Sequence, residues 1–103
     1  MVSMGNAALE AMIAAATVDA YGDDEQLTGL STMIEEYLAV PFPTTVLGVG
    51  VTVQKIDLTA DSIVALCARG RHRQRVDLLD LPLPIPVPEG AAWIDAYRHW
   101  AGR

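Results

Sequence analysis

The chain has 103 residues, 51% of them hydrophobic, and a formal net charge of −6 at pH 7. This length fits one domain, residues 1–103, with a real hydrophobic core, and it excludes two domains. The chain contains no apolar run near the roughly 20 residues that span a bilayer, and its alanine-rich start lacks the basic residues that open a signal peptide. The single cysteine, Cys67, excludes an internal disulfide, so we expect a cytoplasmic protein without membrane contact.

The charge is divided unevenly along the chain. Residues 1–62 contain nine acidic residues and one lysine, a net charge of −8, whereas residues 63–103 contain four acidic residues and six arginines, a net charge of +2. The acidic half repels nucleic acid and attracts cations. We therefore expect it to be compensated either by the arginines of the other half or by a counterion.

Two helices are predicted in the N-terminal part. Apolar residues at helical spacing predict a first helix over residues 7–21, capped by Asn6 and stopped by Gly22. Asp23 is expected to cap a second helix, with Gln26 three residues later in a pair that resembles a capping box. The short connection predicts an αα-hairpin or an L-shaped helix pair.

The middle of the chain has the pattern of short strands. Residues 44–53 are rich in β-branched residues and are punctuated by turns at Gly48 and Gly50, and valines alternate with small or polar residues from Val49 to Val53. Residues 57–61 read as a turn. Residues 63–69 form a near-continuous apolar run, and after a hairpin tip at Gly70–Arg71 the chain returns over residues 73–79. Three or four strands joined locally predict an antiparallel meander, so the fold class is α+β with a curled sheet.

Proline occupies every second position from Pro82 to Pro88, which forbids a central strand and favours polyproline II. We expect this segment to cross the domain as a strap, although it could also be a ligand for a proline-binding module. It leads to a C-terminal helix over residues 90–101. The apolar face of this helix is expected to belong to the core, with a homodimer surface as the alternative; it contains Trp93, Ile94, Tyr97 and Trp100.

Acidic residues at both ends of the second helix are candidates for a cation site. Helix capping and the helix dipole account for Asp23–Glu25 at its start. Glu35 and Glu36 lie near its end, where the dipole disfavours negative charge, and neither helix contains a lysine or arginine. Calcium prefers about six to eight oxygen ligands. A Ca²⁺ ion shared with Asp57 and Asp61 is therefore one compensation that the sequence suggests, and pairing with arginines is the other.

Residues 69–75 contain four arginines and form the only basic patch. Such a patch can contact phosphate or RNA. It has no aromatic residues for base stacking, however, and the chain is acidic, so we expect it to neutralise acidic helices or a partner protein rather than nucleic acid. Cys67, His72 and His99 form neither a nucleophile motif nor a zinc motif, so no enzymatic activity is expected.

The stretch Val18–Phe42 contains, in order, an Asp-Ala-Tyr, a Glu-Gln, a glycine, a Glu-Glu pair and a Pro-Phe. This order resembles the small calcium-binding proteins first described in cyanobacteria. The rest of the chain, through Trp93 and Trp100, looks like actinobacterial-type members of that family. The resemblance implies a small antiparallel SH3-like barrel as one form of the curled sheet.

The resemblance also implies a calcium buffer or sensor that binds Ca²⁺ weakly. The ligands expected for this ion are Glu35, Glu36, Asp57 and Asp61. The chain departs from the family pattern in its strand region, which is apolar where cyanobacterial members look richer in acids. The alternative is a metal-free protein-interaction module or homodimeric adaptor, using the aromatic C-terminal helix and the arginine hairpin.

Overall fold

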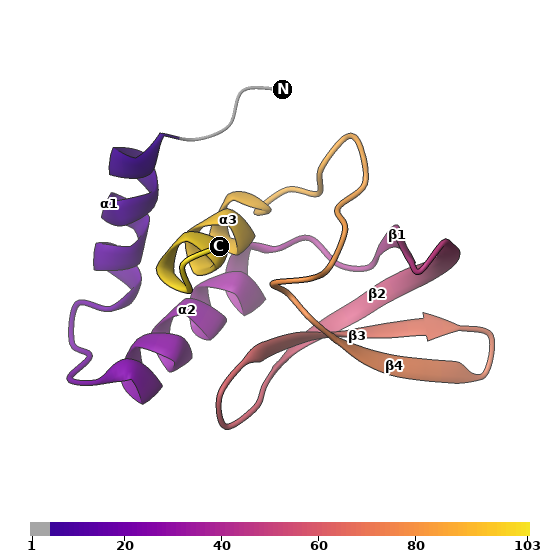
Figure 1. The fold of residues 1–103 in the computed structure, drawn as a ribbon, viewed down its shortest axis with the longest axis horizontal. Helices are drawn as coiled ribbons and strands as arrows, with labels where there is room; N and C mark the ends of the chain where they lie inside the picture. Colours follow the sequence, from indigo (N-terminus) through magenta and orange to yellow (C-terminus); the bar gives the residue numbers. More distant parts are fainter. Residues whose placement is uncertain (1–4) are drawn as a thin grey trace.

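The computed structural model describes residues 5–103. They form three helices and a four-stranded antiparallel sheet, with both N-terminal helices before the sheet and one helix after it (Figure 1). None of the helices in this part of the chain has the length and apolar character needed to cross a membrane. In chain order the elements are α1 (Asn6–Ala16), α2 (Asp23–Tyr37), β1 (Phe42–Val46), β2 (Val49–Leu58), β3 (Ile63–Arg69), β4 (His72–Asp77) and α3 (Ala92–Trp100).

The predicted α+β class and the antiparallel meander are confirmed. The strand order is β1-β2-β3-β4, so every strand pairs with its sequence neighbour, and the sheet is open rather than closed into a barrel. Closure would require a strand that joins the two edges. The chain leaves β4 at Asp77 and enters a segment with four prolines, which cannot supply a central strand.

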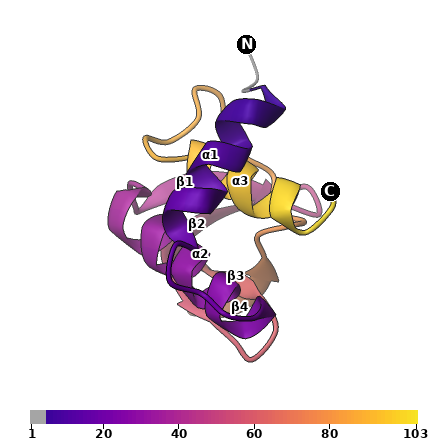
Figure 2. The same cartoon turned by 90° about the vertical axis from the view of Figure 1, so that its left-hand side faces the viewer.

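The helices gather at one end of the sheet (Figures 1 and 2). Helix α2 packs against β2, and α3 packs against both α1 and α2. The contact of α1 with α3 joins the two ends of the described chain and includes His99 Nε2, which lies 3.7 Å from Glu10 Oε1. The helical end and the free end of the sheet therefore lie at opposite ends of the molecule's long axis.

Both helix starts differ from the prediction. Asn6 is the first helical residue of α1 and its N-cap is Gly5, while the N-cap of α2 is Gly22 rather than Asp23; neither cap makes a side-chain hydrogen bond. At α2 the N–H of Tyr21 donates to Glu25 Oε2 at 2.9 Å, so Glu25 reaches back over the first turn.

The first helix is also shorter than predicted, because it ends at Ala16. The Thr17 hydroxyl and N–H both donate to the carbonyl of Ile13, at 2.7 and 3.0 Å, and this satisfies the helix end. Gly29 of α2 lies next to the Ala16 carbonyl oxygen at the end of α1, so close that a Cβ on Gly29 would overlap this oxygen. The two helices approach this closely because position 29 has no side chain.

Two tight turns set the register of the sheet. Leu47 and Gly48 both have positive φ and join β1 to β2, as a two-residue hairpin of type I′ requires. Gly70 and Arg71 join β3 to β4, as predicted, with Gly70 at φ 57°. The register of β2 against β3 shifts once, between Val53 and Lys55. Residues 44–53, where a turn was predicted at Gly48, belong to β1 and β2, so the meander has four of the three or four strands expected, and β3 has the predicted bounds.

The core lies between the helices and one face of the sheet. The aromatic face of α3 contributes to this core, as predicted: Tyr97 is only 2% exposed and stacks on Trp100, and Trp100 Nε1 donates to Gln26 Oε1 at 2.8 Å. The core is formed by Leu27, Leu30, Ile34, Leu38, Phe42, Val53, Ile56, Ile63, Ala65, Cys67, Leu78, Leu81, Ile94 and Tyr97.

The proline-rich segment is held at its start and projects in its middle. Arg98 donates from Nε to the Leu78 carbonyl at 3.0 Å and from Nη2 to the Leu81 carbonyl, and the Thr44 hydroxyl donates to the carbonyl of Pro82. Ile85 is 92% exposed at the outer bend. The segment therefore delivers α3, as predicted, but it forms a loop (Figure 1) rather than a flat strap.

Candidate functional site

The four predicted calcium ligands lie on two elements and one turn. Glu35 and Glu36 are exposed in the last turns of α2, Asp57 is partly buried in β2, and Asp61 is exposed in the β2–β3 turn. Within residues 5–103, no three aspartate, glutamate, histidine or cysteine side chains form a group that could hold a metal ion. The described part of the chain therefore does not gather the four carboxylates into one cluster.

Two of these carboxylates have partners from the protein itself. Asp57 Oδ1 accepts the N–H of Leu58 at 3.0 Å, and its Oδ2 lies 3.7 Å from Arg75 Nη2. Asp61 Oδ1 accepts a long bond of 3.4 Å from the Thr59 hydroxyl. Arginine therefore compensates an acidic residue of the strand, while the ion pairs among the described residues do not include Glu35 or Glu36.

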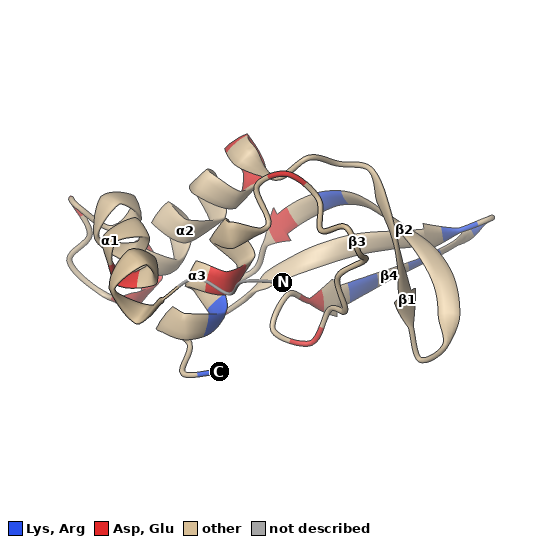
Figure 3. Cartoon of the chain, turned by 90° about the horizontal axis from the view of Figure 1, so that it is seen from above, with Lys and Arg blue, Asp and Glu red and all other residues tan. Residues whose placement is uncertain are grey.

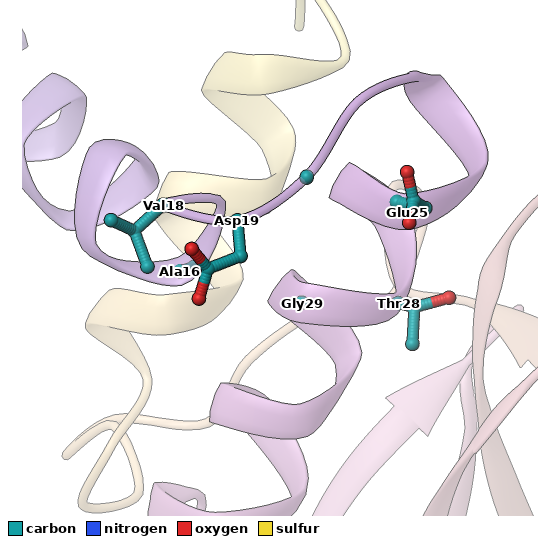
Figure 4. A pocket seen from close by; sticks show the side chains of 7 residues that line it. Ala16, Val18, Asp19, Glu25, Thr28 and Gly29 are labelled. Atoms are coloured by element: carbon teal, nitrogen blue, oxygen red, sulfur yellow. The ribbon is translucent and has the colours of Figure 1, made fainter.

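A first hollow, of about 320 Å³, lies between the α1–α2 connection and α2 (Figure 4). Two carboxylates line it: Asp19 comes from the connection, and Glu25 comes from the first turn of α2. Glu25 is already bonded to the Tyr21 N–H, and negative charge in a first helical turn is stabilised by the helix dipole. The bond from Tyr21 and the helix dipole therefore explain the charge of Glu25 without a ligand, although no side chain caps α2.

A second hollow, of about 450 Å³, lies at the free end of the sheet. Paired residues of neighbouring strands point to the same face of a sheet, and Cys67 pairs with both Val53 and Gln74. The floor of the hollow therefore belongs to the same sheet face that, nearer the core, packs against the helices. Beyond Cys67 the helices no longer cover this face, and Val49 is 42% exposed. The hollow is lined by Val49, Val51, Cys67, Arg69, His72, Arg73 and Gln74.

Two arginines, Arg69 and Arg73, line this hollow, and two more, Arg71 and Arg75, belong to the same β3–β4 hairpin. Arg69, Arg71, Arg73 and Arg75 are all exposed, and in Figure 3 blue segments mark the β3–β4 hairpin while the helical end carries most of the red. Among residues 5–103 only Arg75 of these four has a carboxylate within 4 Å, on Asp57. Three guanidinium groups at this end are thus free of an ion pair with the described residues.

Among the residues that line this hollow, Cys67 carries a thiol. It is 2% exposed, and burial raises the pKa of its thiol, which keeps it protonated. A protonated thiol is a poor nucleophile and a poor metal ligand. Cys67 therefore contributes apolar surface to the hollow.

The sequence identified the arginines but not the hollow. Val49 and Val51 read as the buried side of an alternating strand, and that pattern is the same whether or not a helix covers it. The length of β2, ten residues, is the one feature that could have indicated the hollow, because a strand this long extends beyond the area that short helices can cover.

No family model matches this sequence, and neither the curated proteins nor the solved structures include a significant match. The resemblance to the calcium-binding proteins therefore stays a prediction that rests on the residues of the Val18–Phe42 stretch.

Proposed function

We propose that the protein is a metal-free protein-interaction domain that docks an acidic, partly apolar segment of a partner protein at the β3–β4 hairpin. The observation that carries this proposal is the hollow with a valine floor and a basic rim. Apolar surface in a concave site favours an occupant that removes it from water. Guanidinium groups around it select carboxylates, which they bind through planar, paired hydrogen bonds.

The strength expected for this contact is modest. Each exposed ion pair contributes only about 0.2–1 kcal/mol, because water and salt screen it. The valine floor supplies the remaining affinity, and the arginines supply orientation and choice of partner. We therefore expect a reversible contact that weakens as salt is raised above the physiological concentration, rather than a permanent complex.

The aromatic helix does not belong to this proposal. Tyr97 is buried, and Trp100 is hydrogen-bonded to Gln26, so the face of α3 already has its partners within the chain. Docking by the hairpin alone leaves the core intact, which suits a domain that must stay folded between encounters.

Calcium binding is the competing proposal. It rests on the family resemblance and on Glu35 and Glu36, whose charges lie at the unfavourable end of the α2 dipole. Calorimetry on chelator-stripped protein tests it, with magnesium as the control. Saturable heat from calcium alone would favour the buffer or sensor function, and loss of that heat in Glu35→Lys/Glu36→Lys would assign the ligands.

The docking proposal is tested with an alternating peptide, an acetylated chain of glutamate and phenylalanine in turn, about eight residues long, which matches a typical strand. Binding is measured by fluorescence anisotropy for the native protein, for Arg73→Glu at the hollow, and for Arg103→Glu, which makes the same charge change near Asp80. We expect Arg73→Glu to weaken binding about tenfold, because an attraction becomes a repulsion of similar size.

Three results would overturn the docking proposal. The first is no binding of the alternating peptide by the native protein, and the second is an equal effect of Arg73→Glu and Arg103→Glu. The third is tighter binding of single-stranded RNA than of the peptide at the same salt concentration, which would make the hairpin a phosphate-binding surface. Sedimentation of the protein alone shows whether its own acidic helices occupy the hairpin of a second copy.

A further inference from the structure

The strand that carries the basic rim is also an open edge of the sheet. Among residues 5–103, β4 pairs with β3 on one side and with no strand on the other. Its first four residues, His72–Arg75, are all exposed. An edge strand presents a row of backbone N–H and C=O groups that another strand can use.

The hairpin register shows which backbone groups are free. The N–H of Leu78 donates to the carbonyl of Ile63 at 3.0 Å, so position 78 points its backbone toward β3. Backbone direction alternates along a strand, so positions 76, 74 and 72 also point toward β3. The N–H and C=O groups of Arg73, Arg75 and Asp77 therefore point away from the sheet.

The opposite edge of the sheet is less accessible. Strand β1 contains Pro43, which has no N–H to donate, and it is preceded by Pro41. The Thr44 side chain is bonded to the carbonyl of Pro82, which holds the proline-rich loop at β1. Proline and a covering loop are two of the ways in which proteins protect an edge. Strand β4 contains no proline, and its residues His72–Arg75 are not covered by the part of the chain that the structure describes.

We propose that the acidic partner segment binds as a fifth strand along β4, and this inference rests on the proposed function. Its glutamates lie on the sheet face of Arg73 and Arg75, of which Arg73 also borders the hollow, and its apolar residues lie on the face of His72 and Gln74, which line the hollow as well. Long aromatic side chains on that second face reach diagonally over Gln74 toward Cys67. The free backbone groups of β4 add main-chain hydrogen bonds to the apolar contact at the hollow, and the alternation of side chains adds to the choice of partner that the arginines make.

The arginines also decide against a second copy of this chain as the strand. Pairing of β4 with β4 of another copy sets Arg73 and Arg75 against equivalent arginines, and like charges across a strand pair are destabilising. An acidic strand turns the same contacts into ion pairs. The edge is thus closed to self-association and open to one class of partner.

The test uses two backbone-methylated forms of the alternating peptide. One carries N-methyl groups on its glutamates and the other carries them on its phenylalanines, so charge and side chains are unchanged. In an antiparallel fifth strand the glutamates opposite Arg73 and Arg75 turn their N–H groups toward β4. We expect methylated glutamates to abolish binding and methylated phenylalanines to leave it within about twofold of the parent peptide.

A protein variant tests the same bond from the other side. Arg73→Pro removes an outward N–H without removing a bond to β3, and proline is tolerated at such an edge position. Its matched control, Arg73→Ala, removes the charge and keeps the N–H. We expect Arg73→Pro to bind the alternating peptide about fivefold more weakly than Arg73→Ala, with circular dichroism checking that both are folded.

The outcomes separate this inference from the proposed function. If the unmethylated peptide does not bind, the proposed function is wrong. If it binds and both methylated peptides bind equally well, the docking surface stands and the fifth strand is refuted. Loss with the methylated phenylalanines alone would support a fifth strand that runs parallel to β4.

Discussion

Tyr97→Phe tests how much the hydrogen bond between α3 and the sheet contributes to stability. The Tyr97 hydroxyl oxygen accepts the N–H of Ile63, the first residue of β3, at 3.2 Å, and this bond is buried. Phenylalanine keeps the ring and its stacking on Trp100, whose centroid lies 6.2 Å away. The substitution therefore removes one oxygen atom and leaves the Ile63 N–H buried without a partner among the described residues.

The expected cost follows from that unpaired group. A typical hydrogen bond contributes a net 0.5–1.5 kcal/mol or so, and leaving one buried partner unsatisfied costs about 1–3 kcal/mol. We expect Tyr97→Phe to lower the free energy of unfolding by about 2 kcal/mol at pH 7. Urea unfolding measures this loss as a lower midpoint with an unchanged slope, since the surface exposed on unfolding is the same.

The same side chain predicts a pH dependence. Burial raises the pKa of Tyr97, and the negative charges of Asp77 and Asp61 add to this rise, although the bond from the Ile63 N–H opposes it. The folded-state pKa is then above the unfolded value of about 10. The stability gained from the neutral phenol is complete below pH 10 and is lost as the pH rises through the folded-state pKa.

Phenylalanine has no proton to lose, so the stability difference between native protein and variant should shrink above about pH 10. The refuting result is a pair of urea midpoints that coincide at pH 7, which would mean that the Ile63 N–H does not depend on this hydroxyl. A difference that stays constant from pH 8 to pH 11 would refute the effect of burial on the phenol.

Two further substitutions test the packing between elements. Gly29→Ala improves helix propensity by about 1 kcal/mol but forces a Cβ into the Ala16 carbonyl, so thermal melting should show a net loss of stability of about 1–2 kcal/mol. The control, Thr28→Ala at the exposed neighbouring position, should change stability by less than about 0.5 kcal/mol. Arg98→Met keeps the aliphatic part of the side chain but removes the hydrogen bonds to two loop carbonyls. Urea unfolding should show a free energy of unfolding lower by about 2 kcal/mol. An unchanged midpoint would mean that water replaces the guanidinium without cost.

The sequence predicted the elements whose signals are local. The β3 strand was predicted with its observed bounds, because a glycine-containing turn follows a near-continuous apolar run there. The end of α1 was predicted five residues too late, since Thr17 bonds back to Ile13 and stops a helix that the apolar spacing alone would continue. Such a competing side-chain bond is a weak signal in a sequence.

The candidate site could be predicted only in part, because its shape depends on contacts between distant segments. The arginines of the hairpin were recognised from their spacing. The hollow beside them lies where the core ends along β2, since Val53 is fully buried and Val49 is 42% exposed, and no local pattern in the sequence states where this cover ends. Whether the carboxylates of α2 lie close to those of the β2–β3 turn likewise depends on the tertiary structure. Neither their charge nor their position on a helix predicts the distance between them.

The separation of charge along the molecule has a consequence for the rate of encounter. The molecule is 40 Å long, with the basic hairpin at one end and most of the acidic residues toward the other. The Debye length is about 30 Å at 0.01 M salt and about 8 Å at physiological ionic strength. At very low salt an approaching acidic segment is repelled by the net charge of −6, whereas at physiological salt it senses only the arginines it is about to touch. Added salt should therefore first accelerate and then slow the association, a reversal that a uniformly charged protein of the same net charge would not produce.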